Sequence, residues 1–372
     1  MNREKSKKKM SMELQVESDG TRYSLKPHTV VPLDARDLWR LRDDVASSFV
    51  MNVIATNALK DGLFQQGEFN AKVTLGIKEN IGPVALIRGG WLPMPFAVGS
   101  AFLLDRNVMS ALRNFHRPPS VANGAGDRWW LRFFEDTSVV MSPLPFAWEG
   151  GYRRAQSFEE FSNSFEAGVS ELRSAFPSAI VKQVSTDQLT RLFQIIASTK
   201  DNEEREIDFL MSAIPLILDR VSSNRSADVF IEGLQLVDSV GIERSSLVVL
   251  AVISCLHEDP HGKTYGVGRN LLKPKKMYSV FDAFNAVSDL RHLEQCCILQ
   301  SAFPNERYAL ATCDVAVASF WSALRLRFVC LTSTGKAILE FELAYELVPR
   351  CSNDQRRELL RAIGAKEPNG HS

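Results

Sequence analysis

The spacing of hydrophobic residues changes along the chain and divides it into regions. Residues 38–63 carry apolar side chains at helical spacing, whereas residues 71–94 are rich in β-branched residues, glycine and proline, which favours short strands. We therefore expect a small N-terminal region of mixed helix and strand over residues 1–100.

Two short apolar runs further along the chain end abruptly on an aspartate. Phe102–Leu104 stops at Asp105, the segment YALATC stops at Asp314, and helix-like spacing resumes directly after each. Buried strands that alternate with helices build parallel sheets, in which ligands bind at the carboxyl ends of the strands. We expect an α/β fold with a parallel sheet flanked by helices, and both aspartates at one edge of that sheet.

Helical patterns dominate between these two runs. A short strand over residues 138–141 precedes a helix that carries Glu149, and phenylalanines at steps of three and four predict an amphipathic helix over residues 157–176. Several helices are expected between residues 186 and 255, and the segment 281–303 predicts another. The aromatic stripe of the amphipathic helix is typical of a core face.

Charge and composition narrow the function classes only slightly. The 372 residues are 45% hydrophobic and 24% charged, as in ordinary globular proteins. Because 44 Lys and Arg balance 44 Asp and Glu, nucleic-acid binding would need local basic patches. The basic start MNREKSKKKM lacks a following apolar segment, and no apolar run is long enough for a membrane helix. We expect a cytoplasmic protein that does not contact a membrane.

Three patterns favour ordinary structure over chemistry. Residues 257–261 spell HEDPH, but Pro260 prevents the helix on which a zinc protease holds both histidines, so we expect a polar loop. The run DNEEREID around Glu204 is typical of a solvated helix face. The cysteines show no C-x-x-C spacing and no Cys/His cluster, and we expect reduced core thiols: Cys255, Cys296, Cys297, Cys313, Cys330 and Cys351.

Four short elements, LLDRNV, FAWEGG, SDLRHLE and ATCD, occur in this order along the chain. Together they resemble the PIN-domain nucleases, which carry an aspartate after the first strand, a helical glutamate, an aspartate opening a later helix and an aspartate after the next strand. The resemblance maps these acids, and two polar supports beside them, onto Asp105, Glu149, Asp289 and Asp314, and onto Asn107 and Thr312.

The resemblance also implies a division of the chain. A PIN-like domain is expected over residues 101–328. Because a compact PIN domain needs fewer residues than lie between its second and third acids here, we expect a helical insertion at about 186–276. Residues 329–372 then form a C-terminal extension.

The third acid stays open between Asp289 and Asp282. We favour Asp289 because a serine precedes it at the start of the LRHLE helix, and Glu294 is a candidate outer ligand. Gathered carboxylates repel one another and raise one another's pKa unless a cation neutralises them. Mg²⁺ and Mn²⁺ are the ions that such oxygen ligands favour, so one of them is the expected cofactor.

The activity implied by the resemblance is metal-dependent hydrolysis of a phosphodiester, with RNA as the expected substrate. A phosphatase of the haloacid dehalogenase type is disfavoured, because Asn107 stands where its second aspartate must act as an acid. The alternative is a non-catalytic PIN-like protein whose N-terminal region or insertion binds a protein partner. The basic segment GVGRNLLKPKKMY is expected either to track phosphates or to be merely solvated, through Arg269, Lys273, Lys275 and Lys276.

Overall fold

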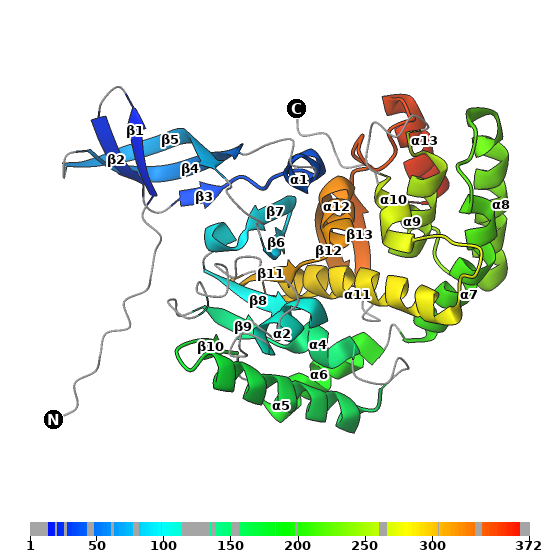
Figure 1. Ribbon diagram of the computed structural model, residues 1–372, viewed down its shortest axis with the longest axis horizontal. Helices are drawn as coiled ribbons and strands as arrows, with labels where there is room; N and C mark the ends of the chain where they lie inside the picture. The colour runs from blue at the N-terminus through cyan, green and yellow to red at the C-terminus, as the bar shows by residue number, and fades with distance from the viewer. Residues whose placement is uncertain are drawn as a thin grey trace, which may run out of the picture.

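Figure 1 shows the computed structural model of the chain, in which an N-terminal sheet, a central sheet and a group of helices follow one another. The structure describes residues 14–18, 21–25, 28–42, 48–60, 63–76, 82–97, 99–113, 134, 139–149, 156–182, 184–197, 200–259, 266–303, 305–331 and 337–364. The basic start of the chain and the end of the HEDPH motif, from Pro260 on, lie outside the described residues.

The central sheet is mostly parallel and has six strands in the order β10-β9-β8-β11-β6-β7. β10, β9, β8 and β11 run parallel, and the β6–β7 hairpin continues the sheet in the antiparallel sense. The expectation of an α/β fold is confirmed. The strands are β6 (Val84–Ile87), β7 (Gly90–Pro93), β8 (Ser100–Leu104), β9 (Val140–Ser142), β10 (Ile180–Val181) and β11 (Arg307–Thr312).

β8 is buried along its whole length because apolar clusters cover both faces of the sheet. Phe102 and Leu104 belong to a cluster with Met109, whereas Leu103 belongs to a larger cluster with Leu144. Successive side chains of a strand point to opposite faces, so a strand covered on both sides is mostly apolar, and in β8 the one polar residue is Ser100 at its start. The covering helices are α2 (Arg106–Arg113), α4 (Leu144–Glu149), α5 (Phe158–Ala175), α11 (Val280–Ala302) and α12 (Val315–Leu324).

The N-terminal region contains a five-stranded sheet. The helix predicted over residues 38–63 is wrong beyond Arg42, because β4 follows it. In β4, buried Met51, Val53 and Ala55 alternate with exposed side chains, which is the period of a strand, and β5 pairs with β4 along most of its length. The elements are β1 (Leu14–Ser18), β2 (Thr21–Leu25), β3 (His28–Val30), α1 (Ala35–Arg42), β4 (Ser48–Lys60) and β5 (Leu63–Gly76).

The structure does not break at the expected domain boundaries. β6 and β7 precede residue 101 but belong to the central sheet, and the indole N–H of Trp321 ties their turn to α12 by donating to the carbonyls of Ile87 (2.7 Å) and Gly90 (2.9 Å). At the other end, β12 (Leu326–Leu331) crosses residue 328 and pairs with β13 (Ala337–Phe341).

The region expected to be a helical insertion is helical. Gly241 ends α8 in the left-handed conformation (φ 74°), and all residues of α9 are buried. None of the described helices is both long and apolar enough to span a membrane. The helices are α6 (Thr186–Ala197), α7 (Lys200–Ile217), the 3₁₀ turn η3 (Ser223–Arg225), α8 (Ser226–Val240), α9 (Leu247–Leu256) and α10 (Val267–Leu272), and α13 (Asn353–Ala362) follows near the C-terminus.

The acidic run at the start of α7 is only partly solvated. Glu204 is exposed, as expected, but the prediction is wrong for Glu206, which is buried. Its carboxylate accepts hydrogen bonds from Arg291 (2.6 Å) and from the Ser246 hydroxyl (3.0 Å). Arg291 also donates to Glu294 (2.7 Å), so one guanidinium serves two carboxylates and joins α7 to α11. Helical periodicity alone could not reveal a buried partner on another helix.

Candidate metal centre

Asp105 and Asp314 follow two neighbouring parallel strands. Leu104 of β8 lies opposite Ala311 of β11, and the backbone N–H of Asp105 donates to the carbonyl oxygen of Ala311 (3.3 Å). Because parallel strands end at the same edge of a sheet, both aspartates stand at its carboxyl edge, where the sequence pattern predicts them.

Each aspartate also begins the helix that follows it. Asp105 Oδ1 accepts the N–H of Val108 (2.7 Å) in the first turn of α2. Asp314 is the N-cap of α12, and its Oδ1 accepts the N–H groups of Ala316 (2.7 Å) and Val317 (3.2 Å). These bonds satisfy the free amides of the two helix ends and hold both carboxylates in fixed orientations.

Thr312 joins the two aspartates. Its side chain is buried, its hydroxyl oxygen accepts the backbone N–H of Asp314 (2.9 Å), and its hydroxyl hydrogen-bonds to the Asp105 carboxylate. Asn107, the other expected polar support, is exposed in the first turn of α2. The two supports predicted from sequence therefore differ in burial, and only Thr312 has a contact to the acids that the structure defines.

Glu149, Asp289 and His292 form the closest group of possible metal ligands. One ligand atom from each lies within 4.8 Å of the others. Glu149 ends α4, whereas Asp289 and His292 lie three residues apart on α11, a spacing that places both on one helix face. Atoms bound to one small divalent ion lie at most about 4.2 Å apart, twice its bond length, so binding requires only a small approach.

Two of the four predicted acids, Asp105 and Asp289, have raised pKa values, and the charges of the other acids contribute to both shifts. Burial raises the pKa of Asp105 to about 6; hydrogen bonds from Thr312 and Val108 oppose the shift, and the charges of Glu149 and Asp314 add to it. Burial also raises the pKa of Asp289 well above its usual value, and the other three acids raise it further. Electrostatic repulsion therefore acts among the four carboxylates, and a bound cation would relieve it.

Arg106 is a cation beside this group. It directly follows Asp105, and its guanidinium forms an ion pair with Glu149. His292 is buried, with Nδ1 3.6 Å from Glu149 Oε1. Burial, with Arg106 adding a smaller effect, lowers the pKa of His292 although Glu149 opposes the shift. The imidazole is therefore neutral at physiological pH, which is the form that binds metals.

Asp289 and Asp282, the two candidates for the third acid, lie at different places on α11. The helix begins with Ser279 as N-cap, and Asp282 closes a capping box with it. Asp282 also accepts an ion pair from Lys275 (2.8 Å). Asp289 lies well inside the helix rather than at its start, so the reason for preferring it was wrong, but its position among the acids supports the choice. Glu294, the expected outer ligand, faces Arg291 instead.

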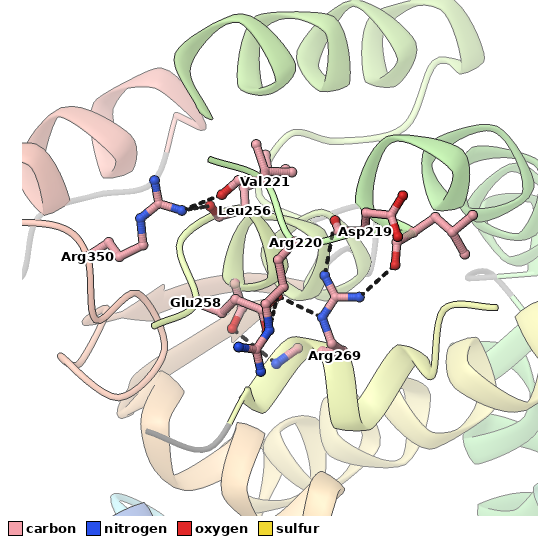
Figure 2. A network of polar contacts seen from close by, with 10 residues as sticks. Asp219, Arg220, Val221, Leu256, Glu258, Arg269 and Arg350 are labelled. Atoms are coloured by element: carbon pink, nitrogen blue, oxygen red, sulfur yellow. Dashed lines mark hydrogen bonds and ion pairs between the residues drawn. The ribbon is translucent and has the colours of Figure 1, made fainter. Parts of the chain in front are cut away.

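The four basic residues expected to track phosphates do not form one surface. Arg269 is half-buried, forms an ion pair with Glu258 (2.7 Å), and donates to the carbonyls of Leu218 (3.1 Å) and Asp219 (3.4 Å), as Figure 2 shows. Its guanidinium is thus committed to holding the end of α7 against α10. Lys275 is paired with Asp282, and Lys276 is exposed.

Lys273 differs from the other three basic residues. It ends α10 in the left-handed conformation (φ 50°), which a lysine seldom adopts, and its charge lowers the pKa of Asp289. Its ammonium group is therefore close enough to influence the acidic group. Of the basic segment, Lys273 is the residue that the structure relates to the candidate site.

The described residues of the HEDPH motif form a loop after α9, and Glu258 in this loop takes part in a buried ion-pair network. His257 ends α9, and Glu258 is only 4% exposed and pairs with Arg269 and more distantly with Arg220 (3.8 Å) (Figure 2). Arg350 donates to the carbonyls of Val221 and Leu256 beside this network. The expectation of a polar loop in place of a helix is confirmed for residues 257–259, although Glu258 in this loop is buried. A glutamate can be buried there because Arg269 neutralises it.

The cysteines agree with the expectation of core thiols at four positions. Cys255, Cys296, Cys297 and Cys351 are buried and free. Cys313 is also free, but it is exposed, because it lies beyond the end of β11 between Thr312 and Asp314. The prediction is wrong for Cys313.

His292 is the residue of the site that the sequence did not predict. The available signal was the D-x-x-H spacing of Asp289 and His292, which puts a carboxylate and an imidazole on one helix face. The spacing became informative only once Glu149 was known to lie beside that face. Comparison with known protein families, curated proteins and solved structures finds no match.

Proposed function

We propose that this protein is a metal-dependent nuclease that hydrolyses phosphodiester bonds in RNA. The observation that carries the proposal is the electrostatic proximity of four acids from distant parts of the chain, two of which follow the neighbouring parallel strands β8 and β11. Glu149 and Asp289, with His292, supply atoms within 4.8 Å of one another, and Asp105 and Asp314 share their field. Structural carboxylates are more often paired singly with cations than grouped in this way.

The donor set fits a divalent cation. Carboxylates and a neutral imidazole are both ligands of Mn²⁺, and carboxylates are also ligands of Mg²⁺. A bound ion would lower the pKa of a water molecule and stabilise negative charge on the leaving oxygen. The caps on Asp105 and Asp314 and the hydrogen bonds of Thr312 keep these side chains in place before any ligand arrives.

Two cations beside the acids suit the handling of a phosphate backbone. Arg106 pairs with Glu149 and is partly exposed, and Lys273 acts on Asp289 while its side chain reaches solvent. Guanidinium and ammonium groups bind phosphate oxygens, and this contact is independent of base sequence. We assign to Arg106 and Lys273 the role of holding the substrate backbone at the edge of the acidic group.

The second candidate is a non-catalytic interaction protein, and one observation favours it. Val50 and Ile54 are 48% and 37% exposed on β4 of the N-terminal sheet, where buried residues alternate with them on the other face. Exposed apolar side chains along a sheet suit a protein partner. This candidate predicts that the acids can be removed without loss of function.

A nuclease assay separates the two candidates. Purified protein is incubated with mixed single-stranded RNA and DNA in the presence of Mn²⁺, Mg²⁺ or a chelator. We expect cleavage of RNA with a divalent ion, none with the chelator, and none by Asp314→Asn. Asp354→Asn is the matched control, because Asp354 is an exposed aspartate in the first turn of α13. Cleavage that persists in the chelator or in Asp314→Asn would overturn the proposal.

A further inference from the structure

His292 is not explained by the packing of α11 alone. Its side chain is 3% exposed, and Nε2 has no hydrogen-bond partner among the described residues. Nδ1 is 3.6 Å from Glu149 Oε1, which is too long for a hydrogen bond, and the hydrogen bond that the imidazole does make is to the backbone of Pro145. A buried polar atom without a partner costs stability, so an apolar residue would serve the fold better at this position.

A simple ion pair with Glu149 does not account for His292 either. The other carboxylate oxygen of Glu149, Oε2, is already bound by Arg106, so the glutamate has its counter-charge. One nitrogen of the imidazole lies within 4.8 Å of a carboxylate oxygen of Glu149 and of a carboxylate oxygen of Asp289. Two carboxylates and one imidazole that converge within 4.8 Å form a half-complete coordination shell.

The nitrogen changes which ion such a shell prefers. Mg²⁺ binds through oxygen and keeps much of its water, whereas imidazole is a ligand for transition metals. Mn²⁺ accepts both carboxylate oxygen and imidazole nitrogen. We propose that Glu149, Asp289 and His292 form a mixed nitrogen and oxygen site that binds Mn²⁺ in preference to Mg²⁺.

The proposal rests on the nuclease function for its purpose but not for its test. Binding of Mn²⁺ and of Mg²⁺ to the full-length protein is measured separately by titration calorimetry, without substrate. We expect Mn²⁺ to bind at least about tenfold more tightly than Mg²⁺, by analogy with the effect of groups that orient metal ligands. His292→Asn replaces the nitrogen ligand by a shorter amide and should abolish this preference by weakening Mn²⁺ binding at least about tenfold.

His257 provides the matched control. Its Nε2 likewise has no hydrogen-bond partner among the described residues. His257 does not belong to the group of possible metal ligands formed by Glu149, Asp289 and His292. His257→Asn should therefore keep the Mn²⁺ preference. If His292→Asn fails to fold, the wild-type protein still decides the question: pulsed electron paramagnetic resonance of bound Mn²⁺ should show nitrogen coupling from one imidazole.

The outcomes separate this inference from the proposed function. Equal affinity for the two ions, or bound Mn²⁺ without nitrogen coupling, overturns the mixed site even if RNA is cleaved. Nitrogen-coupled Mn²⁺ in a protein that cleaves neither RNA nor DNA confirms the mixed site and rejects the nuclease function.

Discussion

Asp105 and Ala311 are joined by a backbone hydrogen bond (3.3 Å) although residues 106–310 lie between them in the sequence. The bond fixes the end of β8 against the end of β11, and the two aspartates that follow these strands are thereby brought to one edge. The register between β8 and β11 thus sets the relative positions of Asp105 and Asp314. Substituting one acid at a time tests the contribution of each charge.

Asp314→Asn should leave the fold intact and weaken metal binding. The asparagine side chain keeps the oxygen that caps α12, so the melting temperature of the metal-free variant should equal or exceed that of wild type, because one repelling charge is gone. Excess Mn²⁺ should raise the melting temperature of the variant less than that of wild type, because the variant has lost one negative charge near Glu149, Asp289 and His292. Calorimetric scans with Mn²⁺ and with chelator measure both. A metal-free variant that melts well below wild type would assign Asp314 a structural role.

Stability of the metal-free protein should fall as pH rises from about 4 to about 6. The pKa of Asp105 is raised to about 6 in the folded protein, so the folded state binds this proton more tightly than the unfolded state. The contribution of Asp105 to the free energy of unfolding therefore decreases over this window and levels off above it, by up to about 3 kcal/mol for a two-unit shift.

Asp105→Asn is the control for this pH dependence. It keeps an oxygen for the N–H of Val108 but does not titrate, so its unfolding free energy should fall less between pH 4 and pH 6. Asp289 shifts in the same direction and leaves a residual slope. Denaturant titrations in chelator at a series of pH values give the comparison, and identical slopes for the two proteins would contradict the raised pKa of Asp105.

Arg106→Gln should tighten metal binding and weaken substrate binding. In the metal-free structure Arg106 neutralises Glu149, so a metal ion must compete with it for the carboxylate. Removing the guanidinium leaves a more negative group, and we expect the Kd for Mn²⁺ to fall about threefold to tenfold, which corresponds to roughly 1 kcal/mol. The exposed Arg357, on α13, is the matched control through Arg357→Gln. Weaker Mn²⁺ binding by Arg106→Gln would show that the arginine orients Glu149 instead of competing for it.

Removing Arg269 should destabilise the protein rather than reduce RNA affinity specifically. Arg269→Ala leaves the buried carboxylate of Glu258 unpaired, and breaking a buried pair of this kind costs about 3 kcal/mol. Lys276→Ala, an exposed change in the next turn, should alter stability by less than about 0.5 kcal/mol. Urea unfolding of both variants tests the contrast. A stable Arg269→Ala variant with lower RNA affinity would return Arg269 to a phosphate-binding role.

Lys273 and Lys275 should differ in their effect on nucleic-acid binding. If Lys273 contacts a phosphate, Lys273→Gln reduces the slope of log affinity against log salt by roughly 0.7 to 0.9, the effect of one contact. Lys275→Gln should leave the slope unchanged, because Lys275 is paired with Asp282. Binding titrations of a catalytically inactive background at several salt concentrations measure the slopes. Equal effects of the two changes would mean that neither lysine has a defined phosphate contact.

The strand ends and their acids were predictable because each was marked locally. A continuous apolar run that stops at Asp105 or Asp314 already contains the information that a buried strand ends there. The failures share a different cause. The spacing in β4 is compatible with a helix, and only the pairing with β5 identifies it as a strand. The acidic run around Glu206 is typical of a solvated face, and only the contact with Arg291 explains its burial. His292 becomes a candidate ligand only because Glu149 lies beside it. Each depends on a partner that is distant in sequence, and spacing along one segment does not encode the partner.

The position of β11 in the sheet determines when, during synthesis of the chain, the acidic group can assemble. β11 lies between β8 and β6, so the central position of the sheet stays open until residues 307–312 are present. During synthesis, which proceeds from the N-terminus, a growing chain can carry Asp105 and Glu149 long before it carries the strand that gathers them with Asp314. A ribosome-bound fragment that stops before β11 therefore cannot assemble the four-acid group, and the producing cell meets the assembled group only on chains that extend beyond β11.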